Sequence, residues 1–221
     1  MDVLSDAQEI LGELKVHFEA SASEASAAAM LAASVNYPLR GAVTWKSTVG
    51  TNVASDALSQ PASSGVKGGA LIIVGEDYGE GSSIMQERSH AFAMKSQIWL
   101  LDPRPNLTSI VNAVETGFQL SEASNTPVML ELRIRACHVY GSFVAKDNVT
   151  PVFTLADAME NPRAIMGGLF CRRRTLNERS RKLRLAGPRR SNSSRTAAST
   201  NSSAAIRAMS ALLFRAVFII R

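Results

Sequence analysis

The sequence predicts an α/β fold with a mostly parallel sheet and helices on both of its faces. Short apolar segments bounded by Gly, Pro, Asp or Asn alternate with longer segments of helical periodicity. This alternation is typical of parallel sheets, because parallel neighbours need a crossover between them. The C-terminal part differs in composition from the rest of the chain. Residues 171–221 contain 13 Lys or Arg and one acidic residue, whereas residues 1–170 contain 11 Lys or Arg and 18 Asp or Glu.

The elements follow from these patterns in chain order. Helices are expected at residues 6–15 and 25–35, the second with Ser23 as its cap, because apolar or small residues recur there at helical spacing. Short apolar or alternating segments predict strands at residues 41–46, 70–74, 97–101 and 128–134. Helical periodicity returns at residues 83–95 and 107–123.

The tail has a different character. Residues 172–203 hold almost no large apolar side chain, so we expect disorder there. Residues 204–220 are apolar again but contain Arg207 and Arg215, which makes the segment too short and too charged for a membrane crossing. At most, the pattern indicates a frayed or surface-seeking helix. The net charge of +5 averages two unlike parts and does not indicate that the whole molecule binds nucleic acid.

Composition bounds the possible chemistry. Cys137 and Cys171 have no CxxC or Cys/His spacing, so we expect a reducing compartment and no metal held by this chain. The N-terminus has neither a basic segment nor an apolar one of the kind found in secretory signals. A cytoplasmic location is therefore expected.

Ligands of parallel sheets gather at the carboxyl ends of strands, here residues 47–52, 75–83, 102–106 and 136–142. Residues 75–83 follow a strand and open a helix, so their amides could hold an anion; an ordinary connecting loop explains the glycines equally well. Glu24 opens an Ala-rich helix, where a carboxylate is usually just favourable with the helix dipole. For His90 and His138 a structural role is expected.

Several segments together resemble the large indolepyruvate ferredoxin oxidoreductase-type proteins, which are thiamine diphosphate-dependent 2-oxoacid:ferredoxin oxidoreductases. The resemblance is ordered and nearly continuous from about residue 6 to residue 163. The segments that carry it are residues 24–30, 36–46, 49–58, 68–83, 86–89, 100–105, 118–124 and 127–138. In this family the corresponding domain receives the aminopyrimidine ring of the cofactor, so residues 1–168 are interpreted as a pyrimidine-binding-like domain.

The resemblance implies roles for particular residues. Glu24 lies where a family carboxylate hydrogen-bonds the aminopyrimidine and favours the tautomer that activates the thiazolium carbon. Arg88 is assigned to the substrate. The residues assigned to cofactor binding are Glu24, Thr48, Asn52, Asp77, Ser82 and Ser83. The implied cofactor is thiamine diphosphate with Mg²⁺, and no metal ligand is assigned in this chain.

Relative to that family the chain lacks the first strand, the diphosphate and Mg²⁺ domain, and the cysteines of iron–sulfur clusters. We therefore expect a fragment that is inactive alone, with residues 169–221 a frameshift product. Ferredoxin and a 2-oxoacid are the implied partners of the intact enzyme, with a dimer or partner domain, no nucleic acid and no membrane span. The alternatives are one subunit of a split enzyme, or a non-catalytic protein whose cationic tail binds nucleic acid or acidic membrane.

Overall fold

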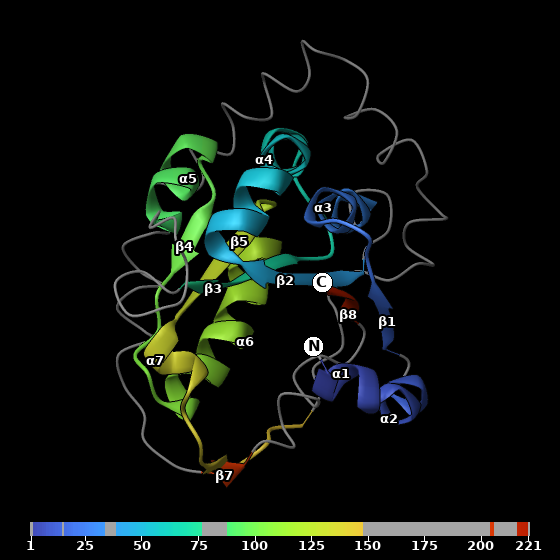
Figure 1. The fold of residues 1–221 in the computed structure, drawn as a ribbon, viewed down its shortest axis with the longest axis vertical. Coiled ribbons are helices and arrows are strands. Elements are labelled where there is room, and N and C mark those ends of the chain that lie inside the picture. Colours follow the sequence, from blue (N-terminus) through green and yellow to red (C-terminus); the bar gives the residue numbers. More distant parts are fainter. Residues whose placement is uncertain are drawn as a thin grey trace.

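A parallel sheet lies at the centre of the molecule, between two layers of helices (Figure 1). The computed structural model describes residues 2–14, 16–33, 39–76, 88–147, 204–205 and 216–220. The main sheet has the strand order β1-β8-β2-β3-β5-β4, and every neighbouring pair is parallel. Its strands are β1 (His17–Ala20), β2 (Arg40–Lys46), β3 (Ala70–Glu76), β4 (Trp99–Leu101), β5 (Val128–Arg133) and β8 (Ala216–Ile220).

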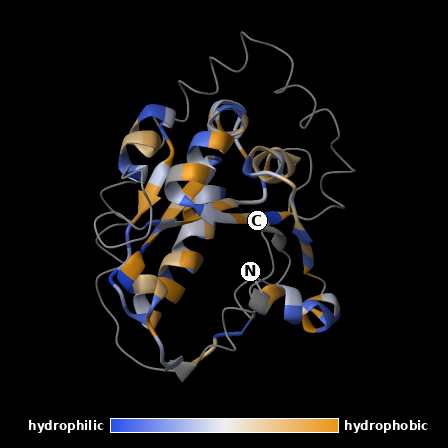
Figure 2. Ribbon diagram, viewed as in Figure 1, coloured by the Kyte–Doolittle hydropathy of each residue, from blue (hydrophilic) through white to orange (hydrophobic). Residues whose placement is uncertain are grey.

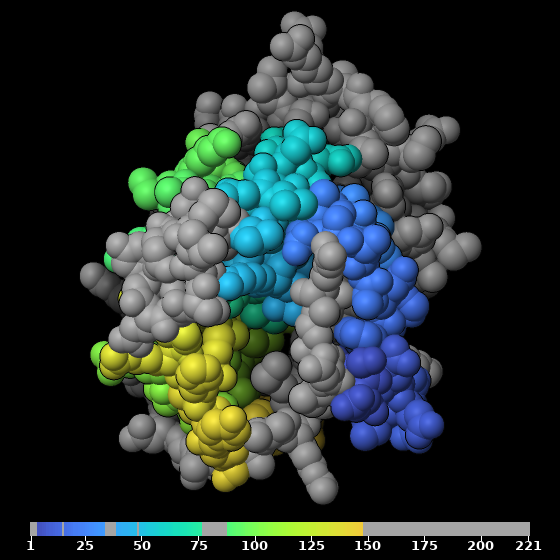
Figure 3. Space-filling model, in the orientation of Figure 1, coloured from blue at the N-terminus to red at the C-terminus, as the bar shows by residue number. Residues whose placement is uncertain are grey.

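One face of the sheet is covered by three helices: α3 (Glu24–Ala32), α4 (Ser47–Ser64) and α5 (Ser89–Ser96). Their inward side chains share a single apolar core with Val43, Ile72 and Met129 of the central strands. Helices α3 and α4 pack against each other, and Figure 3 shows them side by side at the surface of this layer. Helices α3 and α4 begin at the carboxyl ends of β1 and β2.

The opposite face is covered by three further helices: α1 (Asp2–Asp6), α2 (Gln8–Glu13) and α6 (Leu107–Ser124). A second core joins Leu11, Leu71, Phe118 and Leu130. Phe118 is almost fully buried, and burial of such a side chain contributes about 1.5–3 kcal/mol. Figure 2 shows both apolar and polar residues along α4 and α6, as expected for helices that cover a sheet with one face.

The predicted α/β fold with helices on both faces is confirmed. The four predicted strands correspond to β2, β3, β4 and β5, and the last predicted helix corresponds to α6. Ser23 caps α3 as expected, since its Oγ accepts a hydrogen bond from the backbone N of Ser26 at 3.2 Å. Asn106 caps α6 in the same way by accepting from the backbone N of Ser109 at 2.8 Å.

Strand β1 and helix α4 are among the elements that the sequence did not predict. Strand β1 is short and mostly exposed, so it lacks the apolar alternation that marks a strand. Helix α4 contains Gly50 and Pro61 together with many Ser and Thr residues, which have weak helix propensity. Packing against α3 and the sheet, rather than propensity, explains why α4 forms.

The C-terminal segment corrects one sequence-based expectation. Residues 204–220 were expected to form at most a frayed or surface helix, but the structure has strands at β7 (Ala204–Ala205) and β8. Strand β8 pairs with β1 on one side and β2 on the other. Its run of Val, Phe and Ile favours a strand, because such residues fit the pleated surface of a sheet. This segment thus occupies the position between β1 and β2 in the sheet.

The remaining short elements are α7 (Ile134–Cys137) and β6 (Ser142–Phe143), which pairs antiparallel with β7. Within the described residues, no helix has the length and apolar character needed to cross a bilayer. Most of the tail at residues 169–221, including the stretch expected to be disordered, lies outside the described residues.

Candidate functional site

The candidate site is the edge of the sheet where the parallel strands end. Helix α3 begins shortly after β1 and α4 begins directly after β2, so both helix N-termini lie at this edge. Helix N-termini carry unpaired amides and a partial positive charge that favour negatively charged groups. The topology therefore places Glu24, Thr48 and Asn52, all assigned from the sequence, at one edge.

Glu24 is the first residue of α3 and its side chain is partly buried. The Ser23 cap fixes the direction in which this helix starts. Behind Glu24, Ala27 and Ala28 are completely buried, and such small side chains let α3 approach the sheet and α4 closely. Glu24 is thus held on a rigid, capped helix end.

The first turn of α4 is fixed by Trp45, the last buried residue of β2. Its indole Nε1 donates a hydrogen bond to Thr51 Oγ1 at 3.1 Å. Gly50 lies so close that an added Cβ would come within 2.4 Å of the indole ring. Among the site residues, Thr48 lies in this first turn, and Asn52 is exposed one turn further along the helix.

The other assigned residues lie elsewhere or outside the described part. Asp77, Ser82 and Ser83, with most of the loop considered as an anion site, lie outside the described residues. Arg88 is exposed at the N-cap of α5, where its backbone is extended. The structure therefore brings three of the assigned residues to one edge, and Arg88 begins the next helix of the same layer.

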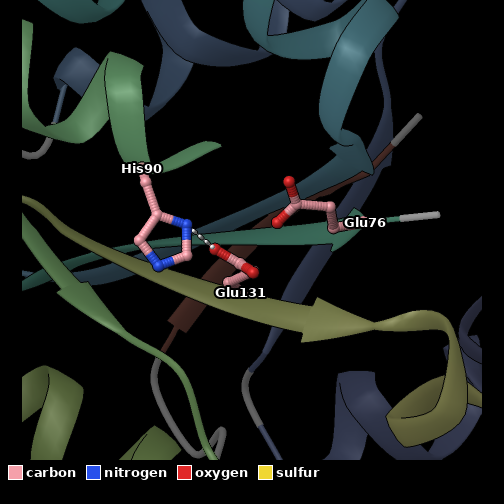
Figure 4. A group of neighbouring side chains, drawn as sticks. All are labelled: Glu76, His90 and Glu131. Carbon is pink, nitrogen blue, oxygen red and sulfur yellow. Dashed lines mark ion pairs between the residues drawn. The ribbon is translucent and has the colours of Figure 1, made fainter. Parts of the chain in front are cut away.

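A polar group lies deeper in the sheet, below α5. It consists of Glu76 at the end of β3, Glu131 in β5 and His90 in α5, with ligand-type atoms that all lie within 4.8 Å of one another. Figure 4 shows the three side chains gathered over the sheet, with Glu131 between His90 and Glu76. Glu76 and Glu131 are only 4% and 2% exposed.

The hydrogen bonds of this group are incomplete. The backbone N of Ser89 donates to Glu76 Oε1 at 3.1 Å. His90 Nδ1 lies 3.1 Å from Glu131 Oε2, but neither atom makes a hydrogen bond of regular geometry, and Glu76 Oε2 has none either. Buried polar atoms normally find partners, so three such atoms together are unusual.

Burial sets the charge of the group. Loss of hydration raises the pKa of Glu131 from 4.5 to about 8, with hydrogen bonding to Glu76 and the charge of Glu76 as further causes. The Arg133 guanidinium, whose Nε lies 3.5 Å from Glu131 Oε1, opposes this only in part. The same Nε atom of Arg133 donates a hydrogen bond to Asp102 Oδ1 at 3.1 Å. Burial and the neighbouring Glu76 therefore favour the protonated form of Glu131.

Sequence reasoning missed this group. His90 was expected to have a structural role, and Glu76 and Glu131 were not singled out. An available signal was the acid at Glu131 inside the otherwise apolar beginning of β5, since an ionisable residue in a buried strand needs a partner. The histidine near the other strand end, His138, is exposed after α7.

Comparison with known proteins agrees with the resemblance drawn from the sequence. The chain is 31% identical over 126 residues to the indolepyruvate oxidoreductase subunit IorA of Methanothermobacter marburgensis, covering 57% of this chain and 20% of that protein. The protein of the same name from Pyrococcus horikoshii is 29% identical over 103 residues, which cover 47% of this chain and 16% of its own length. No family model matches the chain.

These matches confirm the resemblance to indolepyruvate ferredoxin oxidoreductase-type proteins. The chain spans about a fifth of the length of the curated relatives that it matches over the longer stretch. The similarity therefore concerns one segment of a much larger subunit.

Proposed function

We propose that this chain forms the pyrimidine-binding part of a thiamine diphosphate-dependent enzyme that oxidatively decarboxylates a 2-oxoacid of the indolepyruvate or arylpyruvate type, with ferredoxin as electron acceptor. The observation that carries the proposal is the position of Glu24. It opens a capped helix at the carboxyl edge of a parallel sheet, within a chain similar to indolepyruvate oxidoreductase subunits. A partly buried carboxylate on a rigid helix end fits a group that must hold one ring nitrogen.

Thiamine diphosphate, when bound with Mg²⁺, supplies a nucleophilic carbon that attacks the carbonyl of the 2-oxoacid. In this proposal Glu24 hydrogen-bonds the pyrimidine nitrogen and holds the proton whose position controls the tautomer of the ring. Thr48 and Asn52, in the first turns of α4, would help to hold the cofactor. Asp77, Ser82 and Ser83 complete the cofactor site in the same proposal.

Arg88 is proposed to bind the carboxylate of the substrate. A guanidinium pairs well with a carboxylate through parallel hydrogen bonds, and Arg88 begins the helix that follows β3. This gives the site a cofactor end at α3 and α4 and a substrate end at α5.

Partner chains are part of the proposal. The curated relatives are named as subunits, and this chain covers only a fifth of the longer match. We propose that the diphosphate end of the cofactor and the iron–sulfur clusters lie on other segments or chains, in a cytoplasmic assembly, and that residues 1–168 alone are inactive. A split enzyme assembled from several chains is one form of this arrangement.

The test is isothermal titration of the full chain with thiamine diphosphate and Mg²⁺, beside Glu24→Gln and Glu9→Gln. Glu9 is a matched control because it is also a Glu in the first turn of a helix, but lies on the opposite layer. We expect binding that weakens at least about tenfold in Glu24→Gln, equivalent to about 1.4 kcal/mol, and not in Glu9→Gln. Equal affinities in all three proteins would contradict a pyrimidine site at Glu24. No binding by any of them would mean that the site needs the segment that holds the diphosphate.

A further inference from the structure

The buried group of Glu76, His90 and Glu131 has the composition of a metal site. Its three side chains come from β3, α5 and β5 and offer two carboxylate oxygens and one imidazole nitrogen. Two of the three residues are more than nine-tenths buried, and the Oε2 atom of each lacks a hydrogen bond of regular geometry. His90 Nδ1 faces Glu131 Oε2 at 3.1 Å as an ion pair and likewise makes no regular hydrogen bond, whereas Glu76 Oε2 has neither kind of partner (Figure 4).

Charge gives a reason why an additional positive ion belongs there. Two carboxylates held together away from water repel each other, and neither is well hydrated. A single proton could neutralise only one of them and would satisfy few of their lone pairs. A divalent cation would neutralise both carboxylates and accept the imidazole nitrogen as a third ligand.

We propose that Glu76, His90 and Glu131 bind a divalent transition-metal ion of the Zn²⁺ type. Zn²⁺ accepts mixed His and carboxylate ligands, whereas Mg²⁺ and Ca²⁺ prefer oxygen ligands only. Ligand atoms about 2.1 Å from one ion at tetrahedral angles lie about 3.4 Å apart, so atoms that now lie within 4.8 Å of one another must approach by up to about 1.4 Å. Rotations of the two Glu side chains can supply this approach.

The proposed ion would tie α5 to the two central strands β3 and β5. Three protein ligands leave a fourth position for water or another small ligand. The inference does not depend on the proposed cofactor, because it uses no residue assigned to the pyrimidine ring or to the substrate. Its failure would leave the role of Glu24 untouched.

The experiment titrates Zn²⁺ into the full chain after treatment with a chelator, followed by calorimetry, with Mg²⁺ as the comparison ion. Glu131→Gln and His90→Gln remove one ligand each while keeping similar side-chain size. His17→Gln is the matched control: His17 also pairs with a Glu, at 3.3 Å from Glu19, but both are exposed and the described residues offer no third ligand near them. We expect one Zn²⁺ per chain, no comparable Mg²⁺ binding, and at least about tenfold weaker binding in the two ligand variants only.

Thermal unfolding keeps the result interpretable if a variant folds poorly. Glu131→Gln replaces the buried carboxyl group by a neutral amide of the same shape, so it should remain folded in chelator. Zn²⁺ should raise the melting temperature of the unaltered chain and of His17→Gln, but not of Glu131→Gln. A Zn²⁺-induced rise of the same size in Glu131→Gln, or no binding to the unaltered chain, would overturn the proposal.

Discussion

The Arg40 guanidinium donates two hydrogen bonds to the Glu122 carboxylate, from Nε to Oε1 at 2.7 Å and from Nη2 to Oε2 at 3.0 Å. Both side chains are largely buried, and the guanidinium also lies over the Phe118 ring at 5.3 Å from its centre. The pair joins the start of β2 to α6, across the interface between the sheet and its second helix layer. It therefore fixes α6 at the end of the sheet opposite the candidate site.

Replacement of Arg40 by Met should destabilise the fold by about 2–4 kcal/mol, because it leaves the Glu122 carboxylate without its partner in a partly buried site. Lys146→Met is the matched control, since Lys146 pairs with Glu115 on the same helix but is 64% exposed. That variant should lose less than about 1 kcal/mol. Urea unfolding of the two variants checks this, and equal losses would show that burial does not strengthen the Arg40 pair.

Glycine substitutions should separate close packing from helix propensity. Gly50→Ala places a Cβ within 2.4–2.6 Å of three Trp45 atoms, among them the Cβ that the backbone holds in place. We expect a net loss of about 2 kcal/mol despite the better helix propensity of Ala. Gly12→Ala in α2 is the control, because no heavy atom lies within 4 Å of the new Cβ. It should leave stability unchanged or raise it by up to about 1 kcal/mol.

Unfolding midpoints in urea test this pair of glycines. A Gly50→Ala protein as stable as the unaltered chain would mean that Trp45 moves freely. The hydrogen bond from Trp45 to Thr51 would then be a poor anchor for the first turn of α4.

The pKa of Glu131 predicts a dependence of stability on pH in chelator-treated protein. The folded-state pKa of about 8 lies above the ordinary 4.5, so the folded chain holds the extra proton between these values. Stability contributed by this group is therefore full below about pH 4.5 and is lost as the pH rises to about 8, by up to about 1.4 kcal/mol per pH unit. Glu131→Gln should remove this slope.

The comparison uses urea unfolding at about pH 5 and about pH 8, with Glu115→Gln as the exposed-pair control. As the pH rises, the unaltered chain should lose stability relative to Glu131→Gln. The stability of Glu115→Gln relative to the unaltered chain should stay the same. A constant difference would place the titration of Glu131 outside this range.

The strands and helices that could be predicted are those with a local signal. Apolar segments predicted β3 and β5, and a long segment with apolar residues on one helical face predicted α6. Strand β1 has an exposed, polar pattern and α4 a helix-poor composition; both form through contacts with elements distant in sequence. Local periodicity carries no information on such contacts.

The same distinction applies to the candidate site. Glu24 could be placed at the carboxyl edge, because its helix start and cap are local features. The group of Glu76, His90 and Glu131 could not, since its members come from three elements and meet only once the sheet is paired. In the paired sheet Glu131 lies opposite Val74, two residues before Glu76 and on the same face.

Strand β8 leads to the last prediction, on the role of the tail. Removal of residues 216–221 takes away the strand that pairs with both β1 and β2 and leaves two facing edges unpaired. We expect backbone amides of β1 and β2 to exchange with deuterium faster in chain 1–215 than in the full chain, with β5 as the internal control because its neighbours are unchanged. A peptide of residues 210–221 added in trans should restore part of the protection. Unchanged exchange in β1 and β2 after truncation would show that the tail does not support the sheet in solution, as the frameshift interpretation of residues 169–221 requires.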